Sequence, residues 1–114
     1  MSNVYSFNIS LTPYQALSLI RDTLPRNSEL VHEEINDAGD GRMIGTLVYE
    51  RYFFRSANQA ALVIIIDNLQ GVTNVRLIAA GVSNGMILKI DWGAGASFVS
   101  SVEKLLEPYV IDEP

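Results

Sequence analysis

Aromatic and arginine side chains are concentrated near the end of one long apolar segment of the chain. Guanidinium groups and aromatic rings together can bind anionic or planar ligands through stacking and bidentate hydrogen bonds. The same residue types also fill hydrophobic cores and cap the edges of sheets. If a pocket forms between a helix and the sheet, its mouth is expected to carry Tyr49, Arg51, Phe53, Arg55, Asp91 and Trp92.

The other titratable residues do not match a catalytic or metal-binding pattern. His32 is the single histidine, and Glu34 lies two positions later, on the same face of a strand. A general base needs an orienting partner and a nucleophile, and a metal ion needs more ligands. The acidic residues Glu33, Glu34, Asp37 and Asp40 lack the spacing and the closing glutamate of a calcium loop. We interpret His32 as a surface residue of an edge strand, and we expect no catalytic residue, no metal and no cofactor.

A glycine-rich segment, residues 93–97, precedes the last predicted helix. Glycines between a strand and a helix are typical of phosphate-binding loops. The dinucleotide-binding fingerprint requires a third glycine where Phe98 stands, and no strand is predicted after the helix. These glycines are better interpreted as a sharp turn that lets the helix approach the sheet.

Length and composition exclude several classes of protein. The 114 residues suit one domain, assigned to residues 1–114, and the absence of cysteine excludes disulfides and is typical of a reducing compartment. A net charge of −5 with only 8 Lys and Arg disfavours nucleic-acid binding, which requires phosphate neutralisation. The N-terminus does not resemble a signal peptide, and the longest apolar run, Ala60–Ile66, is too short to cross a membrane. We expect a cytoplasmic protein without nucleic-acid or membrane partners.

The pattern of apolar residues predicts a sheet flanked by two helices. Residues 5–11 alternate as in a strand, Thr12 to Gln15 forms a capping box that starts a helix, and Pro25 ends it. Further strands are predicted at 30–35, 43–54, 60–66, 75–80 and 86–92, followed by a helix that ends near Pro108 and a frayed tail from Asp112. The predicted class is α+β, in β-α-β5-α order, with an antiparallel sheet and two helices packed on one face. It looks like a reduced helix-grip fold or a TBP-like saddle, an analogy that carries no function.

Strand parity separates two faces of this sheet. The helix-covered face is expected to hold Phe7, Ile9, Leu11, Val75, Leu77, Leu88, Ile90 and Trp92. The opposite face is expected to hold Ser6, Asn8, Ser10, Arg76, Ile78, Ala80, Ile87, Lys89 and Asp91. The strand at 60–66 is apolar on both sides and must add either Leu62, Ile64 and Ile66 or Val63 and Ile65 to that face. We expect Ile64, Ile78 and Ile87 to mediate self-association, most simply as a symmetric dimer, unless the sheet curls and closes over the patch.

Two stretches carry a resemblance to a known family. They are Leu47–Tyr52 followed by Asn58–Ala60, and Asp91–Ala94 followed by Ser97–Val99. With the order of the elements, they resemble a family of small uncharacterised bacterial proteins with a domain of unknown function. The resemblance implies a bacterial cytoplasmic protein, and it implies no established activity and no catalytic residue.

Three functional hypotheses follow from these patterns. The leading one is a non-enzymatic domain that self-associates through its sheet and binds a small apolar or anionic ligand. The alternatives are an enzyme with a helix–sheet pocket, using Asp91, Tyr49 or Arg51 as polar groups, and an interaction module that offers the sheet face to a different protein.

Overall fold

The computed structural model describes residues 4–24, 28–53, 58–83, 86–88 and 94–112. For residues 52–53, 58–59, 81–83, 86–88, 94–98 and 112 it describes the backbone alone. In chain order the elements are β1 (Val4–Ile9), α1 (Pro13–Thr23), β2 (Ser28–Gly39), β3 (Arg42–Phe53), β4 (Asn58–Asp67), β5 (Thr73–Ser83), β6 (Met86–Leu88), α2 (Ala94–Leu106), the 3-10 turn η1 (Glu107–Tyr109) and β7 (Val110–Asp112). The predicted α+β class is confirmed.

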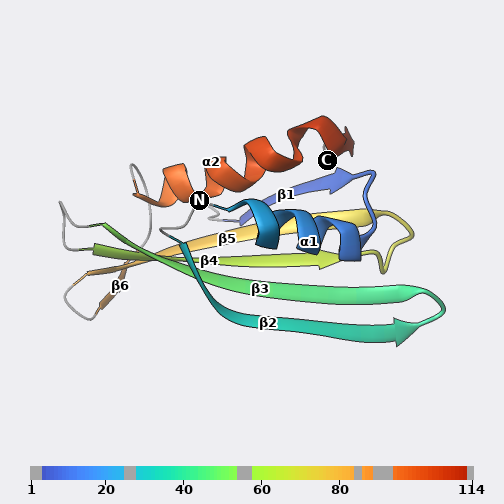
Figure 1. Cartoon of the computed structure of the whole chain (residues 1–114), viewed down its shortest axis with the longest axis horizontal. Helices are drawn as coiled ribbons and strands as arrows, with labels where there is room; N and C mark the ends of the chain where they lie inside the picture. The colour runs from blue at the N-terminus through green and yellow to red at the C-terminus, as the bar shows by residue number, and fades with distance from the viewer. Residues whose placement is uncertain (1–3, 25–27, 54–57, 84–85, 89–93, 113–114) are drawn as a thin grey trace.

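The strands of the described residues form one seven-stranded antiparallel sheet. Its order is β2-β3-β4-β5-β1-β7, and β6 pairs with β5 beside this path. Strands β2 to β5 follow one another as a meander, and β1 returns to lie beside β5 (Figure 1). The two outermost strands, β2 and β7, do not pair with each other, so the strands of the described residues form an open sheet.

Helix α1 begins and ends where its capping residues require. The Thr12 hydroxyl accepts a hydrogen bond from the Gln15 N–H (3.1 Å), and the Gln15 side chain accepts one from the Thr12 N–H (3.0 Å). Pro13 occupies the first turn, where its missing N–H costs nothing. The helix ends at Thr23, two residues before Pro25, as predicted.

Both helices lie on the same face of the sheet (Figure 1). Helix α1 packs on β3 and β4, α2 packs on β4 and β5, and the helices also contact each other. The core between these layers contains Phe7, Ile9, Leu17, Ile20, Leu47, Leu62, Ile64, Ile66, Val75, Leu77, Val102 and Leu106. The faces predicted for residues 7, 9, 75 and 77 are therefore confirmed, and Leu11 is partly buried against the same core.

The turn between β2 and β3 depends on two glycines with positive φ. Gly39 has a φ of 85° and Gly41 a φ of 77°, a region that residues with a Cβ rarely adopt. The Asp37 carboxylate accepts a hydrogen bond from the Gly39 N–H (2.7 Å), which stabilises this turn locally.

Several boundaries differ from the prediction. Strand β2 spans Ser28–Gly39 instead of 30–35, because its backbone stays paired with β3 where its polar side chains no longer alternate with apolar ones. Strand β5 also extends on both sides of the predicted 75–80. After α2, the chain forms η1 at Pro108 and then pairs with the outer edge of β1 as β7. The predicted order lacked both elements, and Asp112 belongs to a strand instead of a frayed tail.

Candidate functional site

The face of the sheet opposite the helices, here called the open face, carries ordered cross-strand rows of side chains. One row runs through His32, Val48, Val63, Ile78 and Val4. The neighbouring row runs through Glu34, Thr46, Ile65, Arg76 and Ser6. Because directly opposed residues in antiparallel strands have closely spaced Cβ atoms, each row forms a continuous band of side-chain contacts.

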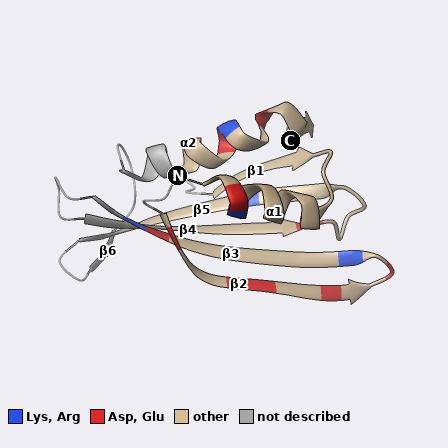
Figure 2. Ribbon diagram, viewed as in Figure 1, with Lys and Arg blue, Asp and Glu red and all other residues tan. Residues whose placement is uncertain are grey.

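The middle of the open face is aliphatic. Val48, Val63, Ile65 and Ile78, here called the aliphatic centre, are all partly exposed. Val4, at the end of the same band, is 44% exposed. Acidic residues lie along β2 and on the helices, while the central strands carry few charges (Figure 2). The open face therefore offers an apolar patch that neither helix covers.

One residue predicted for this patch lies elsewhere. Ile64 was expected at the self-association face, but it is fully buried in the core. The register explains the error, because Ile64 pairs with Leu47 and Leu77, which both project toward the helices. Of the other two residues predicted there, Ile78 does lie on the open face, whereas the side chain of Ile87 lies outside the described residues.

A polar network borders the aliphatic centre near the β4–β5 turn. The buried Asp67 carboxylate accepts hydrogen bonds from Arg76 Nη2 (3.0 Å) and from the Leu69 N–H (3.1 Å). The Asn74 side chain donates to Ser6 Oγ (3.1 Å) and to Asn8 Oδ1 (2.9 Å). Asn8, Asp67, Asn74 and Arg76 line a shallow hollow of about 430 Å³. The open face is thus aliphatic in its centre and polar at this end.

The predicted ligand-binding residues divide into two groups. Tyr49 and Arg51 lie two positions apart on β3 and project into the layer under the helices, where they are only 3% and 5% exposed. Arg51 donates hydrogen bonds from Nε (3.2 Å) and Nη2 (2.8 Å) to the Ser28 hydroxyl on β2. Three of the predicted residues lie outside the described part of the chain: Arg55, Asp91 and Trp92. For Phe53 the structure describes the backbone and not the side chain.

Burial changes the pKa values of Tyr49 and Arg51. The Tyr49 hydroxyl has no hydrogen-bond partner among the residues that the structure describes. Desolvation raises the pKa of Tyr49, and the nearby carboxylate of Glu33 raises it further. Desolvation also lowers the pKa of Arg51. At neutral pH the pair therefore combines a neutral phenol with a buried cation, since an arginine remains charged despite such a shift.

His32 is a surface residue, as predicted. Its Nε2 lies 3.1 Å from Glu34 Oε1, and both side chains are more than half exposed. A hydrogen bond from the Asn36 amide (2.7 Å) and another from His32 lower the pKa of Glu34. No nucleophile accompanies this pair among its described hydrogen-bond partners, and an exposed ion pair contributes little free energy.

Two further properties can be tested within the described part of the chain. No group of three or more His, Cys, Asp or Glu side chains there is arranged to hold a metal ion. No helix there is long and apolar enough to span a membrane. The acidic turn between β2 and β3 accordingly has no metal-binding geometry, and Glu33 instead forms an ion pair with Arg21 of α1.

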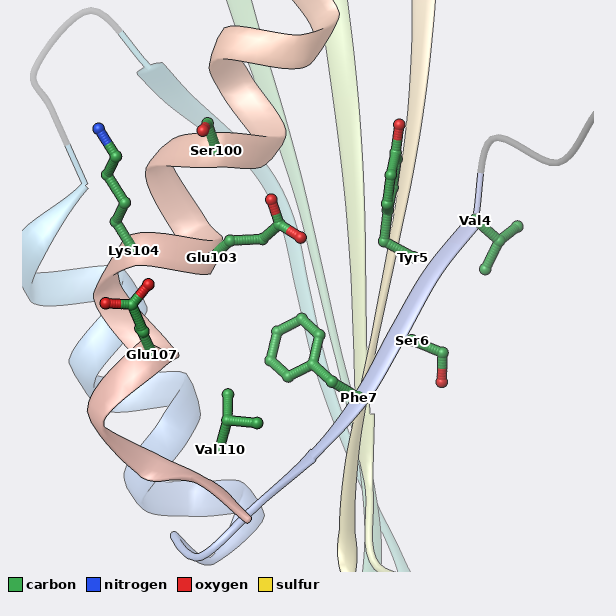
Figure 3. Close-up of a pocket in the computed structure, with 9 residues that line it drawn as sticks. All are labelled: Val4, Tyr5, Ser6, Phe7, Ser100, Glu103, Lys104, Glu107 and Val110. Carbon is green, nitrogen blue, oxygen red and sulfur yellow. The ribbon is translucent and has the colours of Figure 1, made fainter. Parts of the chain in front are cut away.

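A groove that sequence reasoning missed lies between β1 and α2. It has a volume of about 620 Å³, and Phe7 and Val110 lie at its base while Tyr5, Ser100 and Glu103 lie along its sides (Figure 3). Lys104 and Glu107 also line it, but their charged ends point away from β1. The residues come from β1, α2, η1 and β7. The pairing of β7 with β1 helps to bring them together, and the sequence pattern of such a short terminal strand is too weak to predict that pairing.

The fold and these surfaces define a small α+β domain with an antiparallel sheet that is covered by helices on one face. The chain belongs to a family of unknown function, DUF6054, whose family model matches residues 1–110. This confirms the resemblance to a domain of unknown function that the two sequence stretches indicated. No curated protein and no solved structure matches the chain.

Proposed function

We propose that this chain is a non-enzymatic cytoplasmic domain that self-associates through the open face of its sheet, most simply as a symmetric homodimer. The single observation that carries the proposal is the position of both helices on one face, which leaves the aliphatic centre without a covering layer in the described part of the chain. The absence of cysteine supports a reducing compartment. The pairing of β1 with β5 supports the comparison with a helix-grip fold or a TBP-like saddle, which carries no function.

The free energy of self-association would come from burying the side chains of the aliphatic centre together. Full burial of one exposed aliphatic side chain contributes roughly 1.5–3 kcal/mol. Val63 and Ile78 are already partly buried by their neighbours, so each contributes less than this. A self-complementary patch on a two-fold axis doubles every contact, which is why a second copy is the simplest partner.

Sedimentation velocity of the wild-type protein over a wide concentration range tests this proposal. We expect a monomer–dimer equilibrium, and we expect Ile78→Lys to shift it to monomer because a buried unpaired lysine is costly. Ile111→Lys is the matched control, because Ile111 is 57% exposed on β7 outside the aliphatic centre. Circular dichroism checks that both variants fold.

A wild-type protein that stays monomeric up to about 1 mM would contradict self-association. A Kd of that size corresponds to a free energy of association of only about 4 kcal/mol. A monomer that instead forms a defined complex with a different protein, sensitive to Ile78→Lys, would favour the interaction-module alternative. The enzyme alternative also remains a prediction, since Asp91 lies outside the described residues.

We also propose that Tyr49 and Arg51 bind a small anionic ligand. The supporting observation is a buried hydroxyl without a described hydrogen-bond partner, two positions from a buried guanidinium. Inorganic phosphate and benzoate are suitable probes, and a ligand that binds the native state raises Tm. We expect either anion to raise Tm for the wild type and not for Arg51→Met. Equal shifts in both proteins, or no shift in the wild type, would contradict this site.

A further inference from the structure

The outer edge of β1 is only partly occupied. Strand β7 pairs with β1 at Asn8 and Ile9, and no strand of the described residues pairs with Tyr5, Ser6 or Phe7 on that side. The groove between β1 and α2 runs beside this part of the edge (Figure 3). An incompletely paired strand edge is a template for a strand from another chain.

The backbone of Ser6 is oriented for such pairing. The Ser10 N–H donates to the Tyr109 carbonyl (2.8 Å), on the side of β1 that faces β7. Because N–H and C=O groups point alternately to the two sides of a strand, Ser6 presents its N–H and C=O to the same side as Ser10. On the other side of β1, the Phe7 carbonyl accepts a hydrogen bond from the Asn74 side chain of β5 (3.3 Å), which fits this alternation.

The side chains along the groove favour a cation. The Glu103 carboxylate points from α2 toward Tyr5 and Phe7, whereas the neighbouring Lys104 points away from β1 (Figure 3). Tyr5 is 46% exposed, so its ring is accessible. A carboxylate facing an aromatic ring suits an ammonium or guanidinium group, which can form a charge-assisted hydrogen bond with one and a cation–π contact with the other.

The apolar base of the groove sets a second requirement for a peptide that binds there. Phe7 and Val110 lie next to the Glu103 position and are apolar. Side chains two positions apart on a strand project to the same side. An added strand would therefore place a basic residue near Glu103 and an aliphatic residue, two positions away, against Phe7.

We propose that this groove binds an extended peptide segment of another protein, which adds a strand to the edge of β1. The segment carries a Lys or Arg side chain between Glu103 and Tyr5, and an aliphatic side chain two positions away against Phe7 and Val110. A second copy of this chain is a poorer occupant. Its own β1, Val4–Ile9, contains no basic residue to face Glu103.

The test uses a capped peptide of sequence Thr-Thr-Lys-Thr-Val-Thr-Thr, titrated into the full-length protein and followed by NMR. We expect shift changes at Ser6 and Glu103, and slowed hydrogen exchange of the Ser6 amide. Glu103→Gln should weaken binding roughly tenfold, about 1.4 kcal/mol, because it removes the charge that faces the lysine. Glu29→Gln is the matched control, since Glu29 is an exposed residue of β2 at the opposite edge of the sheet.

Changes in the peptide separate strand addition from simple charge attraction. Methylating the peptide's backbone nitrogens removes the donors that pair with β1 and should abolish binding, as should replacing its lysine with glutamate. Equal binding of the methylated peptide would overturn strand addition. Absence of shifts at millimolar peptide, with Lys or with Arg in that position, would overturn the site. A Ser6 amide already protected in the free protein, increasingly so at higher concentration, would show that a second copy occupies the edge.

Discussion

Leu17 of α1 occupies the space above Gly45 of β3 that a Cβ atom would fill. A Cβ built on Gly45 would lie 3.1 Å from Leu17 Cγ and closer still to Cδ1, within the distance that real Cβ atoms avoid. Leu17 is 1% exposed, so it cannot swing out to solvent. Gly45 thus leaves room for the Leu17 side chain, and a larger residue at this position would force α1 and the sheet apart or displace Leu17.

Gly45→Ala is therefore expected to destabilise the fold by about 1–3 kcal/mol, the usual cost of overpacking a core. The urea midpoint of unfolding measures the loss. In the background of Leu17→Ala, which itself costs about 2–5 kcal/mol, the same substitution should cost much less because the clashing atoms are gone. An equal cost in both backgrounds would show that Gly45 is needed for its backbone and not for the space above it.

The capping box of α1 makes a separate contribution to stability. Replacing Thr12 with Ala removes the acceptor for the Gln15 N–H and is expected to cost about 1 kcal/mol. Thr12→Ser keeps the hydroxyl and should retain most of the stability. The difference between the two variants, measured by urea unfolding, isolates the hydrogen bond. If the variants were equally stable, the first turn of α1 would be held by packing of Pro13 and Ala16 alone.

The parts of the fold that were predictable have strong local signals. Thr12, Pro13 and Gln15 determine the start of α1 through short-range chemistry, and Pro25 determines its end. The alternation around Phe7 assigns the faces of β1 without knowledge of its neighbours. Strand β4 has no such signal, because Leu62 and Val63 are both apolar and either parity can face the helices. Its register depends on pairing with β3 and β5, which a single sequence does not encode locally.

The candidate sites were likewise predictable only where a local sequence signal identified their residues. Tyr49 and Arg51 were identified by residue type, and the structure does place them together on one face of β3. Ile64 was assigned to the wrong face because its strand parity was ambiguous. The groove beside Glu103 was not predicted, since it depends on β7, whose few residues carry no periodic pattern.

The ion pair between Asp67 and Arg76 is expected to matter less than the backbone hydrogen bond that Asp67 also accepts. The Arg76 side chain is 42% exposed, so solvent screens the pair and its contribution is less than about 1 kcal/mol. Asp67 is buried, and its Oδ1 accepts the Leu69 N–H in the β4–β5 turn. Asp67→Ala should therefore cost about 1–3 kcal/mol, more than Arg76→Ala, in urea unfolding. A larger loss for Arg76→Ala would reverse this ranking.

The stability of the protein should fall at high pH because of Tyr49. Its pKa is raised in the folded state above the ordinary value of 10.0, chiefly by desolvation, so the unfolded chain releases the phenolic proton first. Stability from this group is complete below pH 10.0 and declines as the pH rises through the folded pKa. Tyr49→Phe lacks the proton and should remove this component of the pH dependence. Tyr14→Phe is the matched control, because Tyr14 is 58% exposed on α1.

At neutral pH the same substitution should not reduce the stability of the protein. Tyr49→Phe removes a buried hydroxyl that has no described partner, and leaving such a group unsatisfied costs about 1–3 kcal/mol. The variant is therefore expected to be as stable as the wild type or more stable in urea unfolding at pH 7, while the ring keeps its packing in the core. A clear loss of stability at pH 7 would mean that the hydroxyl makes a hydrogen bond within the folded chain. The anion-binding role proposed for Tyr49 would then lose its support, since the group would have no free capacity to bind a ligand.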